Sequence, residues 1–389
     1  MARPIYLDYN ATTPVDPAVF DAMAPYFTEH FGNPSSGHAY GWIADEAVTV
    51  AREQLAGLIG ARPDALTFTS GATEAANLAI RGAANAYRGK KDHVVTVATE
   101  HRAVLDPMQD LENEGYCVTV LGVQPDGRLD LEDLRAALTD TTLLVAVMWA
   151  NNETGVIQPI PEIAEIVRER GALFMTDATQ AVGKIPVDVQ HADLLVCSAH
   201  KVYGPKGAGM LYVRSGTPFE PLMRGGSQER KRRGGTENVA AVVGLAEALE
   251  RAQQSAEAEH TRLRALRDRL AAAIREPFGD AVRFNPPLGS DDVETAPHIL
   301  NVSFPPMNGR AVDGEMLLLG LDLAGIHASS GSACTSGAVE PSHVLRALRV
   351  PRETANATVR LSLGRGTTEA DVDFAAEHLV AVVGRQRGG

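Results

Sequence analysis

The sequence contains no apolar run that approaches the roughly 20 residues a membrane-spanning helix needs. Residues 1–8 also lack the apolar core of a secretory signal peptide. Positive charge is in deficit: the formal net charge of −13 argues against a general affinity for nucleic acid or for anionic membranes. We therefore expect a protein that binds neither nucleic acid nor membrane.

Cysteine is scarce and scattered. The three cysteines, Cys117, Cys197 and Cys334, have the spacing of neither a disulfide framework nor a zinc site, so a reducing, cytoplasmic setting is expected. Cys117 and Cys197 lie in apolar strand patterns and are interpreted as packing residues. Cys334 lies in the small, polar, glycine-bearing segment 328–337, where it has no core to fill. This segment predicts a mobile, exposed loop with a reactive thiol.

Alternating apolar and amphipathic segments dominate residues 66–214. The chain of 389 residues exceeds what one hydrophobic core usually supports, so we expect two domains. Helical stretches are predicted at 73–87, 131–138 and 160–170. The alternation predicts an α/β domain with a mainly parallel sheet, helices on both faces and a ligand site beyond the strand ends. Seven strands are expected, at 66–69, 94–98, 117–121, 143–148, 173–175, 194–197 and 210–213.

The remainder of the chain predicts a smaller α+β domain. Residues 238–276 lack proline and, after Gly244, glycine, which indicates long helices leaving the first domain. Strands at 299–304 and 359–363 flank a helix near 315–323 and the loop 328–338. We assign residues 16–255 to the large domain, and residues 1–15 with 256–389 to the small one.

A lysine and an aspartate follow two predicted strands. Lys201 comes shortly after strand 194–197, where its amine can form a Schiff base with an aldehyde cofactor. Asp177 ends strand 173–175 and can either cap the next helix or keep a pyridinium nitrogen protonated. Its place one strand before Lys201 favours the second role. Together the two residues predict binding of pyridoxal phosphate (PLP).

Residues 70–74 follow strand 66–69 and open a helix. Gly71 permits a tight turn, and the free N–H groups of the helix start attract an anion. A simple N-cap by Ser70 or Thr73 is the more common arrangement for such a segment taken alone. Ser198 and His200, beside Lys201, are further phosphate donors and favour a phosphate site.

Three more polar residues follow strand ends. Gln180 is within reach of the same ligand and can donate to its phenolic oxygen, and Asn152 is expected in the same crevice. His101 is either a structural donor or a ring that stacks on the cofactor and shuttles protons.

Five segments resemble the cofactor motifs of the cysteine desulfurases, which are PLP enzymes of fold type I in the class V aminotransferase group. The opening at 6–14 is similar as well, and the similarity runs in order from about residue 4 to residue 380. It implies the fold type I architecture, with a large PLP-binding domain and a smaller domain. The five segments are 69–74, 99–101, 151–155, 177–180 and 198–201.

The resemblance implies a role for each matching residue. Lys201 forms the Schiff base, Asp177 binds the pyridine nitrogen, and Gln180 contacts the ring oxygen. His101 stacks on the ring, and Asn152 lies beside ring and substrate. Thr236 matches a threonine that completes the phosphate site of the other subunit, which implies a homodimer; the basic run 230–233 near it is interpreted as a solvated loop. The phosphate ligands implied within one subunit are Ala72, Thr73, Ser198 and His200.

Cys334 decides the reaction. Segments 329–336 and 340–345 resemble the group I desulfurases, which supply sulfur for iron–sulfur clusters. Lys201 is expected to remove the Cα proton of bound L-cysteine, and Cys334 to take the sulfur as a persulfide, leaving L-alanine. A free thiol has a pKa of about 8.5, so it needs a base, for which His101 is the candidate. Arg360 matches the arginine that pairs with the substrate carboxylate; Arg365 is expected in a surface ion pair.

The persulfide is expected to pass to an acceptor protein such as an iron–sulfur scaffold. No resident metal site is predicted, although the Cys334 persulfide can serve as a transient iron–sulfur ligand. The chain ends at Gly389 without the longer tail that some housekeeping members use to dock a scaffold, so the docking mode stays open.

Two other interpretations remain. An aminotransferase or a selenocysteine lyase of the same class would keep PLP and change the reaction. A non-catalytic sulfur- or iron-handling scaffold on the same fold is disfavoured, because every expected catalytic position is filled.

Overall fold

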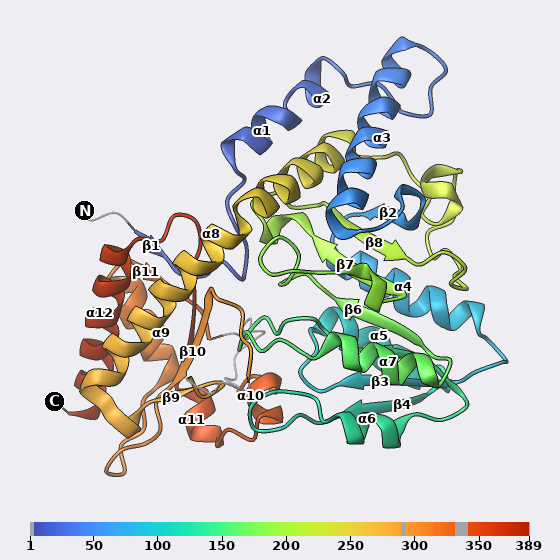
Figure 1. Cartoon of the computed structure of the whole chain (residues 1–389). Helices are drawn as coiled ribbons and strands as arrows, with labels where there is room; N and C mark the ends of the chain where they lie inside the picture. The colour runs from blue at the N-terminus through green and yellow to red at the C-terminus, as the bar shows by residue number, and fades with distance from the viewer. Residues whose placement is uncertain (1–3, 289–292, 331–340, 389) are drawn as a thin grey trace.

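The structure is a computed structural model that describes residues 4–288, 293–330 and 341–388 (Figure 1). Cys334 lies outside the described residues, as does most of the predicted loop 328–338. The predictions that concern this cysteine therefore stay predictions.

A seven-stranded sheet forms the centre of the larger part of the described chain (Figure 1). Strand β8 runs antiparallel to both of its neighbours, and all other neighbouring pairs are parallel. The predicted mainly parallel sheet is confirmed, and each predicted strand ends within two residues of the observed one. In spatial order the strands are β2 (Leu66–Thr69), β8 (Gly209–Val213), β7 (Leu194–Ser198), β6 (Leu173–Asp177), β5 (Thr142–Ala146), β3 (His93–Val97) and β4 (Cys117–Leu121).

Helices cover both faces of this sheet. Strands β5 to β8 are buried along their whole length, which explains why their sequences are nearly continuous apolar runs. One face packs against α4 (Ala72–Ala86) and α5 (Arg102–Asn113). The other face packs against α3 (Ala39–Ile59), α6 (Leu131–Ala137), α7 (Ile160–Glu169) and the first part of α8 (Val239–Phe278).

Two of the cysteines lie in this sheet. Cys197 is buried in β7, as predicted, and burial raises the pKa of its thiol to about 12. The expectation that Cys117 is a packing residue is wrong. Cys117 begins β4, which is an edge strand, and it is exposed.

Helix α8 connects the two parts of the molecule. The predicted long helices are one helix of 40 residues, whose N-terminus is capped by Asn238 Oδ1, which accepts from Ala241 N at 3.2 Å. Its side chains from Val239 to Ala252 pack into the core beside the large sheet. Those from Leu266 to Ile274 pack into a second, separate core.

The second core belongs to an α+β region, as predicted. An antiparallel sheet has the order β12 (Thr358–Ser362), β10 (Ile299–Ser303), β9 (Arg283–Phe284), and β1 (Ile5–Tyr6) pairs in parallel with β11 (Ile326–His327). Helices α9 (Gly314–Leu323) and α12 (Glu369–Arg387) pack on this core, and both chain ends lie on this side of the molecule (Figure 1). The predicted domain boundaries remain a prediction. The shorter helices are α1 (Pro17–Met23), α2 (Pro25–Thr28), α10 (His343–Ala347) and α11 (Arg352–Asn356).

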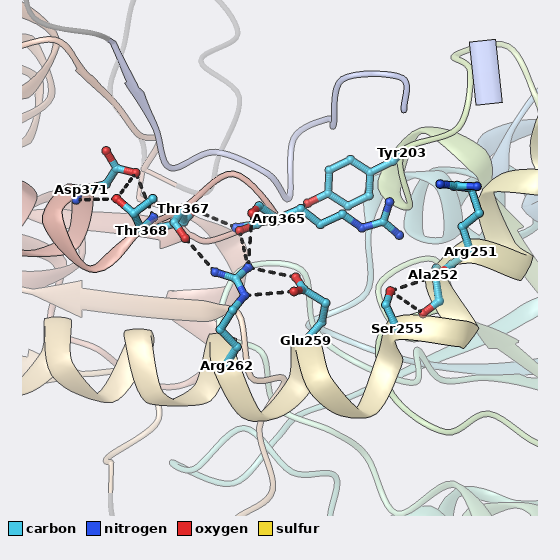
Figure 2. A network of polar contacts seen from close by, with 11 residues as sticks. Tyr203, Arg251, Ala252, Ser255, Glu259, Arg262, Arg365, Thr367, Thr368 and Asp371 are labelled. Carbon is cyan, nitrogen blue, oxygen red and sulfur yellow. Dashed lines mark hydrogen bonds and ion pairs between the residues drawn. The ribbon is translucent and has the colours of Figure 1, made fainter. Parts of the chain in front are cut away.

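A polar network ties the middle of α8 to the segment before α12 (Figure 2). Arg262 donates to the carbonyl oxygens of Thr367 at 2.7 Å and Gly364 at 3.0 Å, and it pairs with Glu259 at 2.9 Å. Arg365 forms the expected ion pair, with Asp16 at 2.9 Å, and its guanidinium also lies over the ring of Tyr203. These contacts hold the second region against the sheet edge that carries the site.

Among the helices of the described residues, none combines the length and the apolar composition that crossing a bilayer requires.

Candidate active site

The carboxyl ends of β6 and β7 bring the predicted cofactor residues to one edge of the sheet. Asp177 is the last residue of β6 and pairs in register with Val196 of the neighbouring β7. Ser198 ends β7, and the 3₁₀ turn η3 (Ala199–Lys201) follows directly. Because the two strands are parallel, Asp177, Ser198 and Lys201 lie at the same edge.

The Lys201 amine is held by main-chain oxygens. Its Nζ donates to the carbonyl oxygens of Asn10 at 2.6 Å and Ala11 at 2.7 Å. Burial, together with the charge of Arg360, lowers the pKa of Lys201 to about 8. A lysine with this pKa has a larger neutral fraction near neutral pH than an ordinary lysine, and the neutral amine is the form that acts as a nucleophile or a base.

Asp177 is buried and uses only part of its hydrogen-bonding capacity. Its Oδ1 accepts from Thr179 N at 2.9 Å, which is the capping contact that the sequence allowed as an alternative. Among the described residues, no donor contacts Oδ2. The Asp177 charge also acts on Lys201 and His101, where it raises the pKa and opposes the effect of burial.

The start of α4 has the features of an anion site. Gly71 is the N-cap residue, with φ of 150°, and no side chain caps the first turn. The alternative of an N-cap by Ser70 or Thr73 is therefore wrong. Ser198 Oγ lies beside this turn, 3.7 Å from where a Cβ on Gly71 would stand. The N–H groups of the first turn, including those of Ala72 and Thr73, have no acceptor within the helix and point out of its N-terminal end.

His200 and the N-terminal segment contact each other. His200 Nδ1 lies 3.2 Å from Thr12 Oγ1, and the His200 carbonyl oxygen accepts from both the main-chain N and the Oγ1 of Thr13. Burial and three lysines, with Lys201 the strongest, lower the pKa of His200 to about 4. The imidazole is therefore a neutral hydrogen-bonding group at neutral pH.

His101 caps α5 and is partly exposed. Its Nδ1 accepts from Ala103 N at 3.1 Å, so the structural role is that of an acceptor rather than the expected donor. Burial of part of the ring lowers the pKa of His101, and Asp177 opposes this change. The ring is thus neutral, with its proton on Nε2 and its lone pair facing Ala103.

Asn10 contacts three other residues of the site. Its carbonyl oxygen accepts from Lys201 Nζ and from Gln180 Nε2 at 3.3 Å, while its Nδ2 donates to Asn152 O at 2.9 Å. The side chain is buried, and its Oδ1 has no donor among the described residues. The N-terminal segment therefore forms one wall of the site, beside Lys201, Gln180 and Asn152.

Arg360 of β12 closes the site from the second region. Its Nη1 donates to Asn152 O at 3.0 Å, and its Nη2 forms an ion pair with Asp8 Oδ1 at 2.7 Å. The guanidinium is buried, and its Nε has no acceptor within the described part of the chain. Arg360 therefore lies beside Asn152, and it already has a carboxylate partner; its predicted pairing with the substrate carboxylate stays a prediction.

Comparison with known proteins agrees with this geometry. The family model described as "Aminotransferase class-V" matches residues 5–374. A curated relative named "Cysteine desulfurase IscS", from Neisseria meningitidis, is 51% identical over 99% of this chain and 93% of its own. A solved "NIFS-LIKE PROTEIN" is 35% identical with a TM-score of 0.90, covering 98% of this chain and all of that one.

The chain belongs to the cysteine desulfurases of the class V aminotransferase family. The fold type I architecture is confirmed, and the cofactor of this family is PLP. A further solved structure, titled "SspA in complex with cysteine", is 34% identical with a TM-score of 0.78, covering 92% of this chain and 98% of that one. The names of these relatives favour the desulfurase over the aminotransferase, the selenocysteine lyase and the non-catalytic scaffold.

The desulfurase site has the donor set that PLP requires. Asp177 offers a buried carboxylate oxygen, and Lys201 offers an amine with a lowered pKa. The start of α4 has uncapped N–H groups, and a Cβ on Gly209 would come within 2.6 Å of Gly71 Cα, so only glycine fits beside this turn. Asp177 therefore fits the pyridine nitrogen, Lys201 fits the aldehyde, and the start of α4 fits the phosphate.

Residues on either side of the Cys334 segment attach to the same site. The main chain of Ser329 pairs with that of Arg360, whose N donates to Ser329 O at 2.6 Å. After the segment, Ser342 Oγ donates to the buried Glu153 at 2.6 Å, and His343 Nε2 lies 2.9 Å from Glu100 O. Both attachment points are thus next to residues of the site.

Thr236 is exposed on the loop between η4 (Gln228–Lys231) and α8. The expectation of a solvated basic run holds for Arg230 and Lys231, which are exposed. It is wrong for Arg232 and Arg233. Arg232 donates to Asp64 O at 2.9 Å, and Arg233 pairs with Glu74 in the first turn of α4 at 2.8 Å.

Sequence reasoning missed three residues of the desulfurase site: Asp8, Asn10 and Lys184. The first two lie in the opening 6–14, whose resemblance to the family was the only available signal. Lys184 follows Gln180 by four residues in a short turn, and no pattern singled it out. Among the described residues, no cluster of three or more His, Cys, Asp or Glu side chains could hold a metal ion.

Proposed function

We propose that the protein is a group I cysteine desulfurase. It removes sulfur from L-cysteine, releases L-alanine and carries the sulfur as a persulfide on Cys334. The relatives support this reaction, and so does the position of the chain on either side of Cys334. The residues that flank the Cys334 segment are bound beside the site: Ser329 pairs with the main chain of Arg360, and Ser342 donates to Glu153, the neighbour of Asn152.

The chain's residues divide the work of binding the cofactor. PLP, when bound, draws electrons from the substrate carbon and so makes the carbon–sulfur bond breakable. Asp177 holds a proton at the ring nitrogen, and Gln180 donates to the ring oxygen. His101 stacks on the ring. The phosphate is held by Ala72, Thr73, Ser198 and His200, with Thr236 contributed by a second copy of the chain.

Lys201 and Arg360 act on the substrate. With a pKa of about 8, Lys201 takes the Cα proton of L-cysteine. Arg360 binds the substrate carboxylate, and its existing contacts to Asp8 and to Asn152 O hold the guanidinium in place. Asn152 lies beside both ring and substrate.

Cys334 accepts the sulfur. Its thiolate attacks the sulfur of the bound L-cysteine: a sulfur–sulfur bond forms as the carbon–sulfur bond breaks. The released electron pair stays with the carbon fragment, which takes up one proton at Cβ and regains the proton at Cα to become L-alanine. His101 accepts the thiol proton on its lone pair, so the Nδ1 contact with Ala103 N must open in this step.

The persulfide passes to an acceptor protein such as an iron–sulfur scaffold, and the enzyme works in the cytoplasm as a homodimer. Support for the dimer comes from the exposed Thr236 and from an apolar surface over α1, α2, the segment after α2 and the start of α3. Large exposed apolar patches mark protein interfaces. The exposed side chains are Phe20, Phe27, Phe31, Tyr40 and Trp42, each more than half exposed.

Cys334→Ser tests the reaction, with Cys117→Ser as the matched control. The Cys334 variant is expected to bind PLP with wild-type affinity and absorbance, yet to produce neither alanine nor sulfide from L-cysteine. The Cys117 variant is expected to keep full activity. Normal alanine production by the Cys334 variant would contradict the persulfide mechanism.

A further inference from the structure

A buried lysine–histidine pair lies behind Gln180. Lys184 Nζ donates to Gln180 Oε1 at 2.7 Å and lies 3.3 Å from His298 Nε2. Gln180 and His298 are both buried, and Lys184 keeps part of its side chain exposed while its Nζ sits between them. Gln180 reaches from this pair to the Asn10 carbonyl oxygen in the active site, at 3.3 Å.

The lysine contact decides which way the Gln180 amide points. An amide has an acceptor oxygen and a donor nitrogen of nearly equal size, so turning it over costs little in packing. Because the protonated amine of Lys184 can only donate to it, the oxygen faces Lys184 whenever the lysine carries its charge. The nitrogen then faces the active site, where a donor to the ring oxygen of PLP is required.

His298 accepts from Lys184 and so fixes the lysine in turn. Burial, together with the charges of Lys184, Arg267 and Arg360 and of His260, lowers the pKa of His298 well below its ordinary value. The ring is therefore neutral and can accept at Nε2. Burial, aided by Lys201 and Arg360, lowers the pKa of Lys184 to about 7.

Lys184 and Lys201 also border the same small cavity of about 50 Å³, which has room for a few water molecules. Glu259 and His260 of helix α8 are among the residues that line this cavity, as are Tyr203 and Arg365. Figure 2 shows Glu259, Tyr203 and Arg365. Glu259 is held by Arg262 rather than by Lys184. Among the described residues, Lys184 has no carboxylate within ion-pair distance.

We propose that Lys184 is a positioning residue for PLP: supported by His298, it holds Gln180 with its amide nitrogen toward the ring oxygen. A buried lysine without a carboxylate partner lowers stability, so packing does not explain its presence. The inference rests on the proposed contact between Gln180 and the cofactor ring.

The affinity of the apoenzyme for PLP, measured by titration, tests this in a double-mutant cycle. Lys184→Met is expected to weaken PLP binding about 5- to 30-fold when Gln180 is present, as for the loss of one charge-assisted hydrogen bond. In the Gln180→Ala background the same substitution is expected to change the affinity less than twofold. Lys90→Met, on an exposed lysine, is the matched control and should change nothing.

His298 gives a second, independent arm. Asparagine at 298 retains an acceptor, so His298→Asn is expected to keep PLP affinity closer to wild type than His298→Leu. Melting temperatures of the apoenzymes report on folding; Lys184→Met should melt no lower than wild type, because an apolar side chain replaces a buried amine.

The outcomes separate the two proposals. If Gln180→Ala leaves PLP affinity unchanged, the proposed contact of Gln180 with the ring is wrong, and the role of Lys184 falls with it. If Gln180→Ala weakens binding but Lys184→Met does not, only the role of Lys184 is wrong. Equal losses from Lys184→Met in both backgrounds would show that the lysine is merely structural.

Discussion

A buried ion pair fixes the loop that carries Thr236, and breaking it should cost far more than breaking a surface pair of the same geometry. Arg52 of α3 contacts both carboxylate oxygens of Glu229, at 2.9 and 2.7 Å. Glu229 also accepts from Phe68 N at 2.9 Å, and the Arg52 guanidinium lies over the Phe68 ring. The Arg52 and Glu229 side chains are 8% and 2% exposed.

The backbone at Glu229 explains why this loop needs an anchor. Glu229, Arg230 and Lys231 have φ values of 46°, 54° and 65° in succession. Each non-glycine residue in this left-handed region costs about 1–2 kcal/mol. The ion pair and the Phe68 contact hold the first of the three residues in place, and Thr236 follows five residues after the last.

Glu229→Gln preserves the size of the side chain but leaves the Arg52 guanidinium buried without a counter-charge. Removing one partner of a buried pair typically costs about 3–5 kcal/mol of stability. The double variant Arg52→Met/Glu229→Gln removes the unpaired charge as well. It is therefore expected to be more stable than Glu229→Gln alone.

Urea unfolding of the apoenzymes, compared by transition midpoint, measures these differences. The matched control is the pair Arg62–Asp64, which has the same two-point geometry at 3.0 and 2.9 Å but side chains that are 76% and 49% exposed. Asp64→Asn should leave the midpoint within experimental error, since exposed pairs contribute little. The reasoning is refuted if Glu229→Gln lowers the midpoint no more than Asp64→Asn does.

Three further predictions concern charge and thiol chemistry. Because burial lowers the pKa of Lys184 from 10.5 to about 7, the unfolded chain binds more protons than the folded one between these values. Melting temperatures of the apoenzyme should therefore rise more from pH 7 to pH 9 in the wild type than in Lys184→Met; equal slopes would contradict this. In a Cys334→Ala background, iodoacetamide should modify the exposed Cys117 and spare the buried Cys197 in the native protein, as read by peptide mass spectrometry; rapid modification of Cys197 would show that it is accessible. Lys201→Ala should lose the visible absorbance of lysine-bound PLP, and an unchanged spectrum would assign the Schiff base to another lysine.

Local pattern was sufficient to predict the large sheet. Strands that are buried on both faces must be apolar along their length, so 194–197 and 210–213 were placed within one residue of the observed strands. Pattern does not reveal the order of strands, and Cys117 was misjudged because β4 lies at the edge. The sequence also did not show that residues 239–278 form one continuous helix, because the continuity of α8 depends on packing into two separate cores.

In the site too, residues placed by local sequence pattern could be predicted, and residues placed by contacts between distant parts of the chain could not. Lys201 and Asp177 could be predicted because each directly follows a strand. Asn10 and Asp8 could not, since the chain must bring them across 191 and 352 residues to reach Lys201 and Arg360. The acceptor role of His101 depends on the start of α5, a helix that was not among those predicted from the sequence.

Mass spectrometry of the PLP-loaded protein after brief incubation with L-cysteine tests the central claim most directly. The account predicts one added sulfur atom on the peptide that contains Cys334, none on those of Cys117 and Cys197, and none anywhere in Lys201→Ala. Absence of added sulfur from Cys334 in an enzyme that still forms alanine, or its appearance on Cys117 instead, would contradict the account.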